Sequence, residues 1–209
     1  MTPNRRDFLK TTLAGGVAAL AVSTLLPGAA RALEVDQARS FIEKVVAEIT
    51  TLIQSGKSAD AQRAEFSEIF RRNAAVPQIT RFVMGQTWRD MSDAQKAKAE
   101  DALVSYVGRV YAGLLSDYQG QTLEVVAAKD FGGKGVLVTS RAKGAKVDDS
   151  TVEWQVSDRG GKVQVVDVVA EGVSLLQTQR QEFAAMIDKR NGDVDRFLDD
   201  LAAGRVAEG

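Results

Sequence analysis

The carboxylates that could carry out acid–base chemistry lie at the turns and ends of the predicted strands. Asp167 and Glu171 flank the end of the last predicted strand, and Asp148 and Asp149 lie in a turn between two strands. Asp is favoured in turns, Glu171 can stabilise the N-terminus of the following helix, and Asp167 can accept backbone hydrogen bonds or pair with an arginine. Asp167 nevertheless remains a candidate general base, provided that it lies in an apolar pocket.

Two residue types on which many catalytic sites depend are missing. The chain has no Cys and no His, which excludes thiolate nucleophiles, disulfides, triads built on His and most zinc or non-haem iron sites. No calcium-type Asp-x-Asp-x-Asp-Gly loop occurs, and no Walker loop or Gly-x-Gly-x-x-Gly follows a strand. Residues 132–135 (GGKG) instead indicate a tight hairpin turn. The sequence therefore predicts no metal and no cofactor, and it favours binding over catalysis.

Composition and charge describe an ordinary globular protein. Of 209 residues, 44% are hydrophobic and 26% are charged, with 27 Lys and Arg against 28 Asp and Glu. Nucleic-acid binding usually needs a strongly basic field, so nucleic acid is not an expected partner. The length suits one well-buried domain.

The first 32 residues have the pattern of an export signal. Arg5 and Arg6 precede an apolar, small-residue run over residues 11–26, and a small-residue site ends at Ala32. The arginine pair resembles the twin-arginine motif of exported, prefolded proteins. An uncleaved anchor and the general secretory route are the alternatives, but the run is shorter than the roughly 20 residues that a membrane span needs.

We therefore predict cleavage between Ala32 and Leu33, a periplasmic location, and a single mature domain over residues 33–209. Cleavage removes four cationic residues and one acidic residue, which leaves a net charge of −4.

Apolar residues that recur every three or four positions predict several amphipathic helices. Ser92 with Gln95, and Ser174 with Gln177, form Ser-x-x-Gln capping boxes that mark two of the helix starts. The long helix that follows Ser92 has a broad apolar face interrupted by Gly108 and Gly113, which indicates close approach of another backbone or of a ligand. The predicted helices cover residues 34–54, 58–72, 78–87, 93 to beyond 115, 174–190 and 193–204.

Short, Val-rich runs between turn residues predict four strands, at residues 122–128, 135–142, 151–157 and 162–169. No helix separates them, which favours an antiparallel meander. The order of helices, then strands, then helices predicts an α+β domain with one curved antiparallel sheet of about four strands, packed by N- and C-terminal helices.

Two stretches resemble the MlaC family, also called toluene-tolerance auxiliary proteins. Residues 82–89 (FVMGQTWR), followed by Ser92, Gln95, Tyr111 and residues 118–122 (YQGQT), resemble the central part of that family. Residues 165–175 (VVDVVAEGVSL) resemble its "YDVxxEGVS" segment, with Val166 in place of the usual aromatic residue. The resemblance extends over about residues 35–201.

This resemblance implies a periplasmic carrier that moves phospholipid between the inner-membrane Mla ABC transporter and an outer-membrane lipoprotein complex, maintaining outer-membrane lipid asymmetry. The implied fold is a curved sheet covered by helices, distantly like nuclear transport factor 2, with acyl chains held between sheet and helices. The chain departs from the family in its twin-arginine signal, in Val163 where an aromatic residue is common, and in its short C-terminal tail. The width of the pocket is therefore open.

We expect the cavity to lie between the long helix and the sheet. Its predicted lipid-binding residues are Phe82, Val83, Val107, Val110, Tyr111, Trp154, Val156, Val168, Val173 and Leu176. The sequence also allows two alternatives. One is an isomerase or dehydratase that uses Asp167 as its base, and the other is an adaptor whose apolar residues form only a core.

Overall fold

The computed structural model describes residues 33–115, 122–143 and 151–206. These residues belong to one compact unit, Ala32–Gly209. Asp148 and Asp149 lie outside the described residues. The elements in chain order are α1 (Val35–Ile53), α2 (Ala59–Asn73), α3 (Val76–Met84), η1 (Thr87–Arg89), α4 (Asp93–Leu115), β1 (Thr122–Asp130), η2 (Gly132–Lys134), β2 (Val136–Lys143), β3 (Thr151–Ser157), β4 (Gln164–Ala170), β5 (Val173–Ser174), α5 (Leu175–Asp188) and α6 (Val194–Ala202).

The sheet is an antiparallel meander in the order β1-β2-β3-β4-β5. The predicted α+β class is confirmed, with one strand more than the four that we expected. The additional strand, β5, has only two residues and pairs with the end of β4. Glu171 and Gly172 form the turn between them, and both have positive φ angles, of 51° and 81°. A two-residue strand is too short to show a period-two pattern and therefore cannot be predicted from one.

A β-bulge interrupts β4 at Val166. Gln155 pairs with Asp167 and Val156 pairs with Val165, which leaves Val166 without a partner on β3. A bulge bends its strand and changes the direction of nearby side chains, and bulges are common beside functional sites. Here the bulged residue lines a cavity together with residues of α2 and α5.

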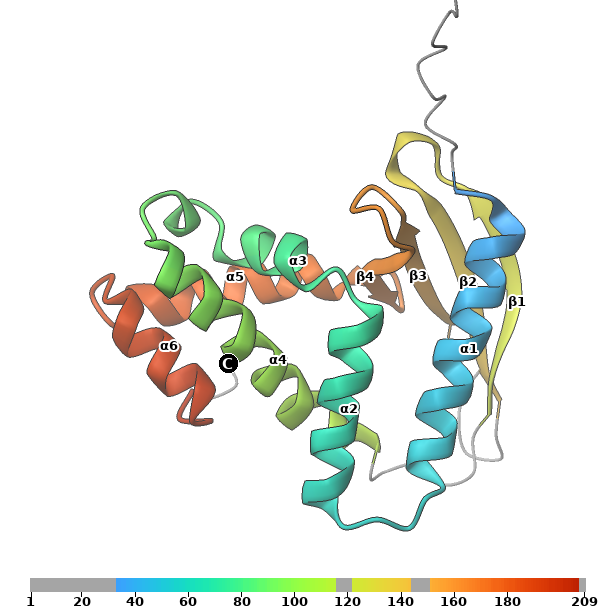
Figure 1. Ribbon diagram of the computed structural model, residues 1–209, viewed down its shortest axis with the longest axis horizontal. Helices are drawn as coiled ribbons and strands as arrows, with labels where there is room; N and C mark the ends of the chain where they lie inside the picture. Colours follow the sequence, from blue (N-terminus) through green and yellow to red (C-terminus); the bar gives the residue numbers. More distant parts are fainter. Residues whose placement is uncertain (1–32, 116–121, 144–150, 207–209) are drawn as a thin grey trace, which may run out of the picture. The chain divides into compact units, whose positions relative to one another are not determined.

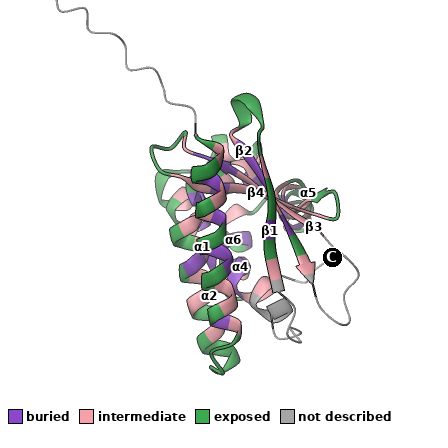
Figure 2. Cartoon of the chain, turned by 90° about the vertical axis from the view of Figure 1, so that its right-hand side faces the viewer, coloured by how far each residue is buried: buried purple, intermediate pink, exposed green. Residues whose placement is uncertain are grey.

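Helix α1 covers one face of the sheet (Figure 1). Its buried side chains Ala38, Ile42 and Val46 pack against apolar residues of β1, β2, β3 and β4. The outward side of α1 is exposed (Figure 2), as its amphipathic pattern predicts. The Arg39 guanidinium donates a hydrogen bond of 3.0 Å to the Val125 carbonyl oxygen, which ties the helix to the edge strand β1.

The remaining helices form a second core. The Phe183 ring of α5 makes edge-to-face contacts with Tyr106 of α4 and Phe197 of α6, with centroids 5.5 and 5.2 Å apart.

The capping box at the start of α4 is confirmed: the Gln95 amide donates to the Ser92 hydroxyl at 3.2 Å, and the Ser92 amide donates to the Gln95 side chain at 2.9 Å.

Gly108 allows α2 and α4 to cross closely. A Cβ atom built at this glycine would lie 2.0 Å from the Ser67 hydroxyl oxygen and 3.2 Å from the Arg63 carbonyl oxygen. A larger residue would have to displace the Ser67 side chain and crowd the Arg63 carbonyl oxygen, so the expected close approach of another backbone at Gly108 is confirmed. No helix in the described part of the chain is both long and apolar enough to span a membrane.

An ion-pair cluster holds the C-terminal end of the domain. Asp200 of α6 accepts hydrogen bonds from Arg190 at 3.0 Å and from Arg205 at 2.9 Å. These two hydrogen bonds hold the pKa of the Asp200 carboxyl below its usual value. Arg190 also donates to the Met186 carbonyl oxygen, so the cluster links α5, α6 and the segment after α6.

Candidate functional site

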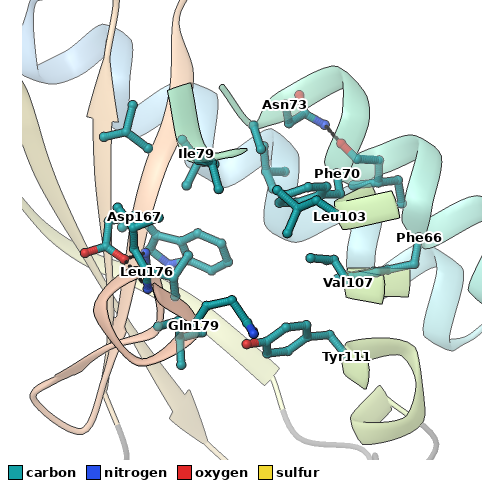
Figure 3. A pocket seen from close by; sticks show the side chains of 18 of the residues that line it. Phe66, Phe70, Asn73, Ile79, Leu103, Val107, Tyr111, Asp167, Leu176 and Gln179 are labelled. Carbon is teal, nitrogen blue, oxygen red and sulfur yellow. Dashed lines mark hydrogen bonds between the residues drawn. The ribbon is translucent and has the colours of Figure 1, made fainter. Parts of the chain in front are cut away.

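A cavity of about 220 Å³ lies between the helices and the sheet (Figure 3). Residues from α1, α2, α3, α4 and α5 line it together with β3 and β4, so it separates the helical core from the core between α1 and the sheet. The lining residues are Val45, Ile49, Phe66, Ile69, Phe70, Asn73, Ala74, Ile79, Val83, Leu103, Val107, Tyr111, Trp154, Val165, Val166, Asp167, Val168, Leu175, Leu176 and Gln179.

The walls are apolar, and much of their large apolar surface is not covered by protein. Phe66, Phe70, Ile79 and Leu176 are only half-buried although they lie between packed elements. Side chains of this kind are normally closely packed inside a protein, with few voids larger than a water molecule. The uncovered surface therefore belongs to a space that an apolar ligand can occupy.

Most polar side chains in the walls have partners within the protein. The Trp154 indole donates to the Ser140 hydroxyl at 2.8 Å. The Asn73 amide donates to the Ile69 carbonyl oxygen at 3.0 Å and to the Glu48 carboxylate at 3.3 Å. With their donors bound in this way, Trp154 and Asn73 present mainly carbon to the cavity.

Asp167 links the sheet to α5. Its Oδ1 accepts from the backbone amides of Val168 at 2.8 Å and Leu176 at 3.1 Å, and its Oδ2 accepts from the Ser174 hydroxyl at 2.7 Å. Ser174 in turn accepts from the Gln177 amide at 3.1 Å and caps α5. Three donors thus hold the carboxylate in place, which is the structural interpretation that the sequence allowed.

We expected Glu171 to stabilise the N-terminus of the helix that follows the sheet, but in the structure Asp167 does so. Glu171 is exposed in the turn between β4 and β5, and no acidic residue lies in the first turn of α5. The carboxylate at the N-terminus of α5 comes from β4, because the short strand β5 folds Ser174 back beside Asp167. The sequence could not show this, since it depends on the turn at Glu171.

The structure brings six of the ten predicted lipid-binding residues together in the cavity walls. They come from three helices, α3, α4 and α5, and from two strands, β3 and β4: Val83, Val107, Tyr111, Trp154, Val168 and Leu176.

The other four lie outside the cavity. Val156 is 0% exposed and packs in the core beneath α1, whereas Val173 is 56% exposed beside the β4–β5 turn. Phe82 and Val110 pack against the helical core, and the Arg180 guanidinium lies over the Phe82 ring. In α3, Val83 lies four residues after the wall residue Ile79 and lines the cavity, whereas Phe82 lies three residues after it and does not. In α4, Tyr111 and Val110 differ in the same way relative to Val107. Helical periodicity places positions three and four residues apart on the same face, so it does not distinguish them.

Several wall residues were not predicted. Helix α2 supplies Phe66, Ile69 and Phe70, whose spacing marks one helix face but does not show what that face covers. Gln179 of α5 is 8% exposed and donates to the Glu182 carboxylate at 3.0 Å. In Figure 3 the Gln179 and Tyr111 side chains point toward each other, away from the end of the cavity that holds Phe70 and Leu103.

The chain is 21% identical over 150 residues to the intermembrane phospholipid transport system binding protein MlaC of Haemophilus influenzae, covering 68% of this chain and 70% of that protein. It is 28% identical over 98 residues to the toluene tolerance protein ttg2D of Pseudomonas putida, but this match covers only 47% of this chain and 45% of that protein.

A solved structure shares the fold. The phospholipid-binding protein of Ralstonia solanacearum, determined in complex with a phospholipid, superposes with a TM-score of 0.68 at 22% identity. The match covers 80% of this chain and 97% of that chain. The arrangement of sheet and helices described above is therefore found in an experimental structure.

Two family models match the chain. The twin-arginine translocation signal matches residues 2–22, which include the predicted Arg5 and Arg6 motif, and the protein is accordingly periplasmic. The second model, MlaC protein, matches residues 41–203 and so covers most of the chain. That family consists of lipid-binding carriers and not of enzymes, which removes the alternative of an isomerase or dehydratase. This periplasmic α+β protein belongs to the MlaC family.

Proposed function

We propose that the protein binds one phospholipid with its acyl part in the cavity and carries it through the periplasm. The observation that supports this most directly is the 220 Å³ space walled by half-buried Phe, Ile and Leu side chains. The Haemophilus influenzae relative is named as a phospholipid transport binding protein, and the Ralstonia solanacearum structure holds a phospholipid. Both support the assignment of a lipid as the cargo.

The energetics of lipid transfer explain why such a cavity is needed. Each methylene group exposed to water costs about 0.8 kcal/mol. A diacyl lipid in water therefore exposes apolar surface worth tens of kcal/mol, and a carrier competes with a bilayer only if it covers most of that surface. A dry, apolar wall serves this purpose without any catalytic group.

The size of the cavity bears on how the lipid is held. A cavity of about 150 Å³ accommodates benzene, so 220 Å³ corresponds to roughly nine carbon atoms on the same scale. This is part of one acyl chain. Loading a whole lipid then requires the two cores to move apart, and we place the opening between α2 and β4, which lie on opposite sides of the cavity.

We further assign an orientation to the bound lipid. The polar side chains Gln179 and Tyr111 lie together at one end, whereas Phe70, Leu103 and Ile79 surround the other (Figure 3). An ester or headgroup oxygen can accept a hydrogen bond from an amide, and an alkyl chain cannot. The polar part of the lipid should therefore lie at Gln179 and Tyr111, with the chain directed toward Phe70.

The donor and acceptor of the lipid are part of the same proposal. We infer that the protein exchanges lipid with an inner-membrane Mla ABC transporter complex and with an outer-membrane lipoprotein complex, and thereby maintains the lipid asymmetry of the outer membrane. The periplasmic location and the name of the Haemophilus influenzae relative, an intermembrane phospholipid transport system binding protein, support this inference.

Native mass spectrometry of the mature protein purified from periplasm tests the cargo. We expect a mass increase that matches a phospholipid, and loss of this increase in Val107→Phe, because the larger ring extends into the cavity and takes up space that an acyl chain needs. Val173→Phe is the matched control, since Val173 is exposed outside the cavity. A wild-type protein that carries no lipid, and takes up none from vesicles, would support the adaptor alternative instead.

A further inference from the structure

Two turns lie beside each other at one end of the sheet (Figure 1). The β1–β2 hairpin turns at residues 131–135, and the β3–β4 turn spans residues 158–163. The pairs Val136–Val156 and Ser157–Gln164 put both turns at the same end. We call residues 129–135 and 158–162 the sheet tip. None of these residues lines the cavity.

The sheet tip is held together by hydrogen bonds between its two turns. The Arg159 guanidinium donates to the Gly133 carbonyl oxygen, and the Gln155 amide of β3 donates to the Lys134 carbonyl oxygen at 2.9 Å. Gly135 has a φ of 98°, and a Cβ atom there would lie 2.0 Å from the Val156 carbonyl oxygen. The hairpin therefore lies directly on β3, and the side chains of both turns form one surface.

This surface combines an exposed aromatic ring with cations. Phe131 is 39% exposed, and the Lys134 ammonium lies 5.1 Å from its ring centroid. The cationic side chains of the tip are Lys129, Lys134, Arg159 and Lys162, and its acidic side chains are Asp130 and Asp158. Asp130 is partly engaged, because it accepts from the Gly132 amide at 2.8 Å. The tip thus carries two net positive charges, whereas the predicted mature chain carries a net charge of −4.

We propose that the sheet tip docks the protein on the surface of an anionic lipid bilayer. Anionic membranes attract clusters of Lys and Arg, and proteins that lie on a membrane surface bury Trp, Phe and Leu side chains at the boundary between headgroups and acyl chains. The tip is a projecting pair of turns and not a groove, and a fluid bilayer can receive such a projection without a complementary shape. By contrast, exposed Val173 at the opposite end of the sheet follows acidic Glu171.

Docking by the tip is independent of the cavity, so it goes beyond the carrier function. It would hold the protein at a membrane while cargo enters or leaves. Because the attraction is electrostatic, it should weaken as ionic strength rises and screens the exposed charges.

Vesicle co-sedimentation tests the proposal with the mature protein. We expect binding to vesicles that contain phosphatidylcholine and phosphatidylglycerol, and much weaker binding to vesicles of phosphatidylcholine alone. Each cation near an anionic surface contributes about fivefold to binding, so Lys129→Gln with Lys134→Gln should weaken binding by about 25-fold. Phe131→Ser should weaken it as well, and its effect should persist at high salt.

Matched controls lie outside the tip. Lys44→Gln with Lys189→Gln removes two exposed cations from α1 and from the end of α5, and Val173→Ser removes an exposed apolar side chain from the other end of the sheet. These controls should bind anionic vesicles like the wild type. Val107→Phe should also bind them while it lacks cargo, which separates docking from lipid carriage.

Either of two results would overturn the proposal. One is a wild-type protein that does not distinguish anionic from neutral vesicles, which would assign the tip to a protein partner or to solvent. The other is an equal loss of binding in the tip and control variants, which would show a response to total charge and not to this surface.

Discussion

Replacing valine by glutamate at two positions distinguishes a cavity wall from a solid core. Val107 of α4 lines the cavity and is 9% exposed, whereas Val156 of β3 is 0% exposed and lies in the core under α1. The two residues have the same side chain and similar burial. One lies in a helix and the other in a strand, but the difference that matters for a buried carboxylate is the space beside each side chain.

The expected costs follow from that difference. At Val156 the new carboxyl group has no access to water and must stay neutral, and raising a Glu pKa from about 4.3 to above 7 costs about 4 kcal/mol. Losing the buried valine adds about 2 kcal/mol. The sum of about 6 kcal/mol is comparable with the whole stability of a typical domain, about 5–15 kcal/mol.

At Val107 the carboxylate can extend into the cavity, which has room for several water molecules. The cost is then about 2 kcal/mol of lost apolar burial, and the hydrated charge opposes an acyl chain in the same space. Val107→Glu should stay folded and lose its lipid, whereas Val156→Glu should unfold or melt roughly 8–16 °C lower than Val107→Glu.

Thermal unfolding and lipid extraction on each purified variant measure both effects. Val107→Ile is the control for a change of shape without charge, and it should keep both fold and lipid. Equal destabilisation of the two glutamate variants would contradict the assignment of Val107 to a cavity wall, because the space beside Val107 would then not admit water. A Val107→Glu variant that stays folded and retains its lipid would contradict it as well.

Three further predictions concern export, the α5 cap and the C-terminal ion pairs. Replacing Arg5 and Arg6 by Lys should leave precursor in the cytoplasm on cell fractionation, and normal maturation in a strain without the twin-arginine translocase would contradict that route. Asp167→Ala removes three hydrogen bonds and should destabilise the domain by about 3 kcal/mol. Asp167→Asn should keep most of the stability and the lipid, and a stable, lipid-loaded Asn variant without function in cells would instead indicate a role for the charge. The pKa of Asp200 is lowered by its two arginine partners, so the stability that it provides is present above its unfolded pKa of about 3.9 and is lost as the pH falls through the lower folded value. Asp200→Asn should therefore reduce the loss of unfolding free energy at acid pH. An unchanged dependence of stability on pH would show that the two ion pairs of Asp200 do not contribute to it.

The helices were predictable because their signals are local. The Ser92–Gln95 box and the three-to-four residue spacing of apolar side chains mark α4 without reference to any other element. The strands β1 to β4 were likewise readable from Val-rich runs between turns. The family resemblance over residues 82–89 and 165–175 supplied the expectation of a cavity.

The walls of the cavity were only partly predictable because they depend on packing between distant segments. Phe66 and Phe70 lie about a hundred residues before β4 in the chain, and no local pattern shows that they face it. The bulge at Val166 shifts the register of β4 by one residue, which decides which valines face the helices. Strict alternation from the sequence could not locate that shift.

The position of Trp154 gives the protein a natural optical reporter. The chain has two tryptophans, and only Trp154 lines the cavity, whereas Trp88 lies beside Lys96 at the start of α4. Indole emission shifts to shorter wavelengths when water around the ring is replaced by hydrocarbon. In a Trp88→Phe protein, the emission maximum of Trp154 should therefore move to shorter wavelengths as a lipid enters the cavity. Loading and release of the lipid could then be followed in real time without an attached dye.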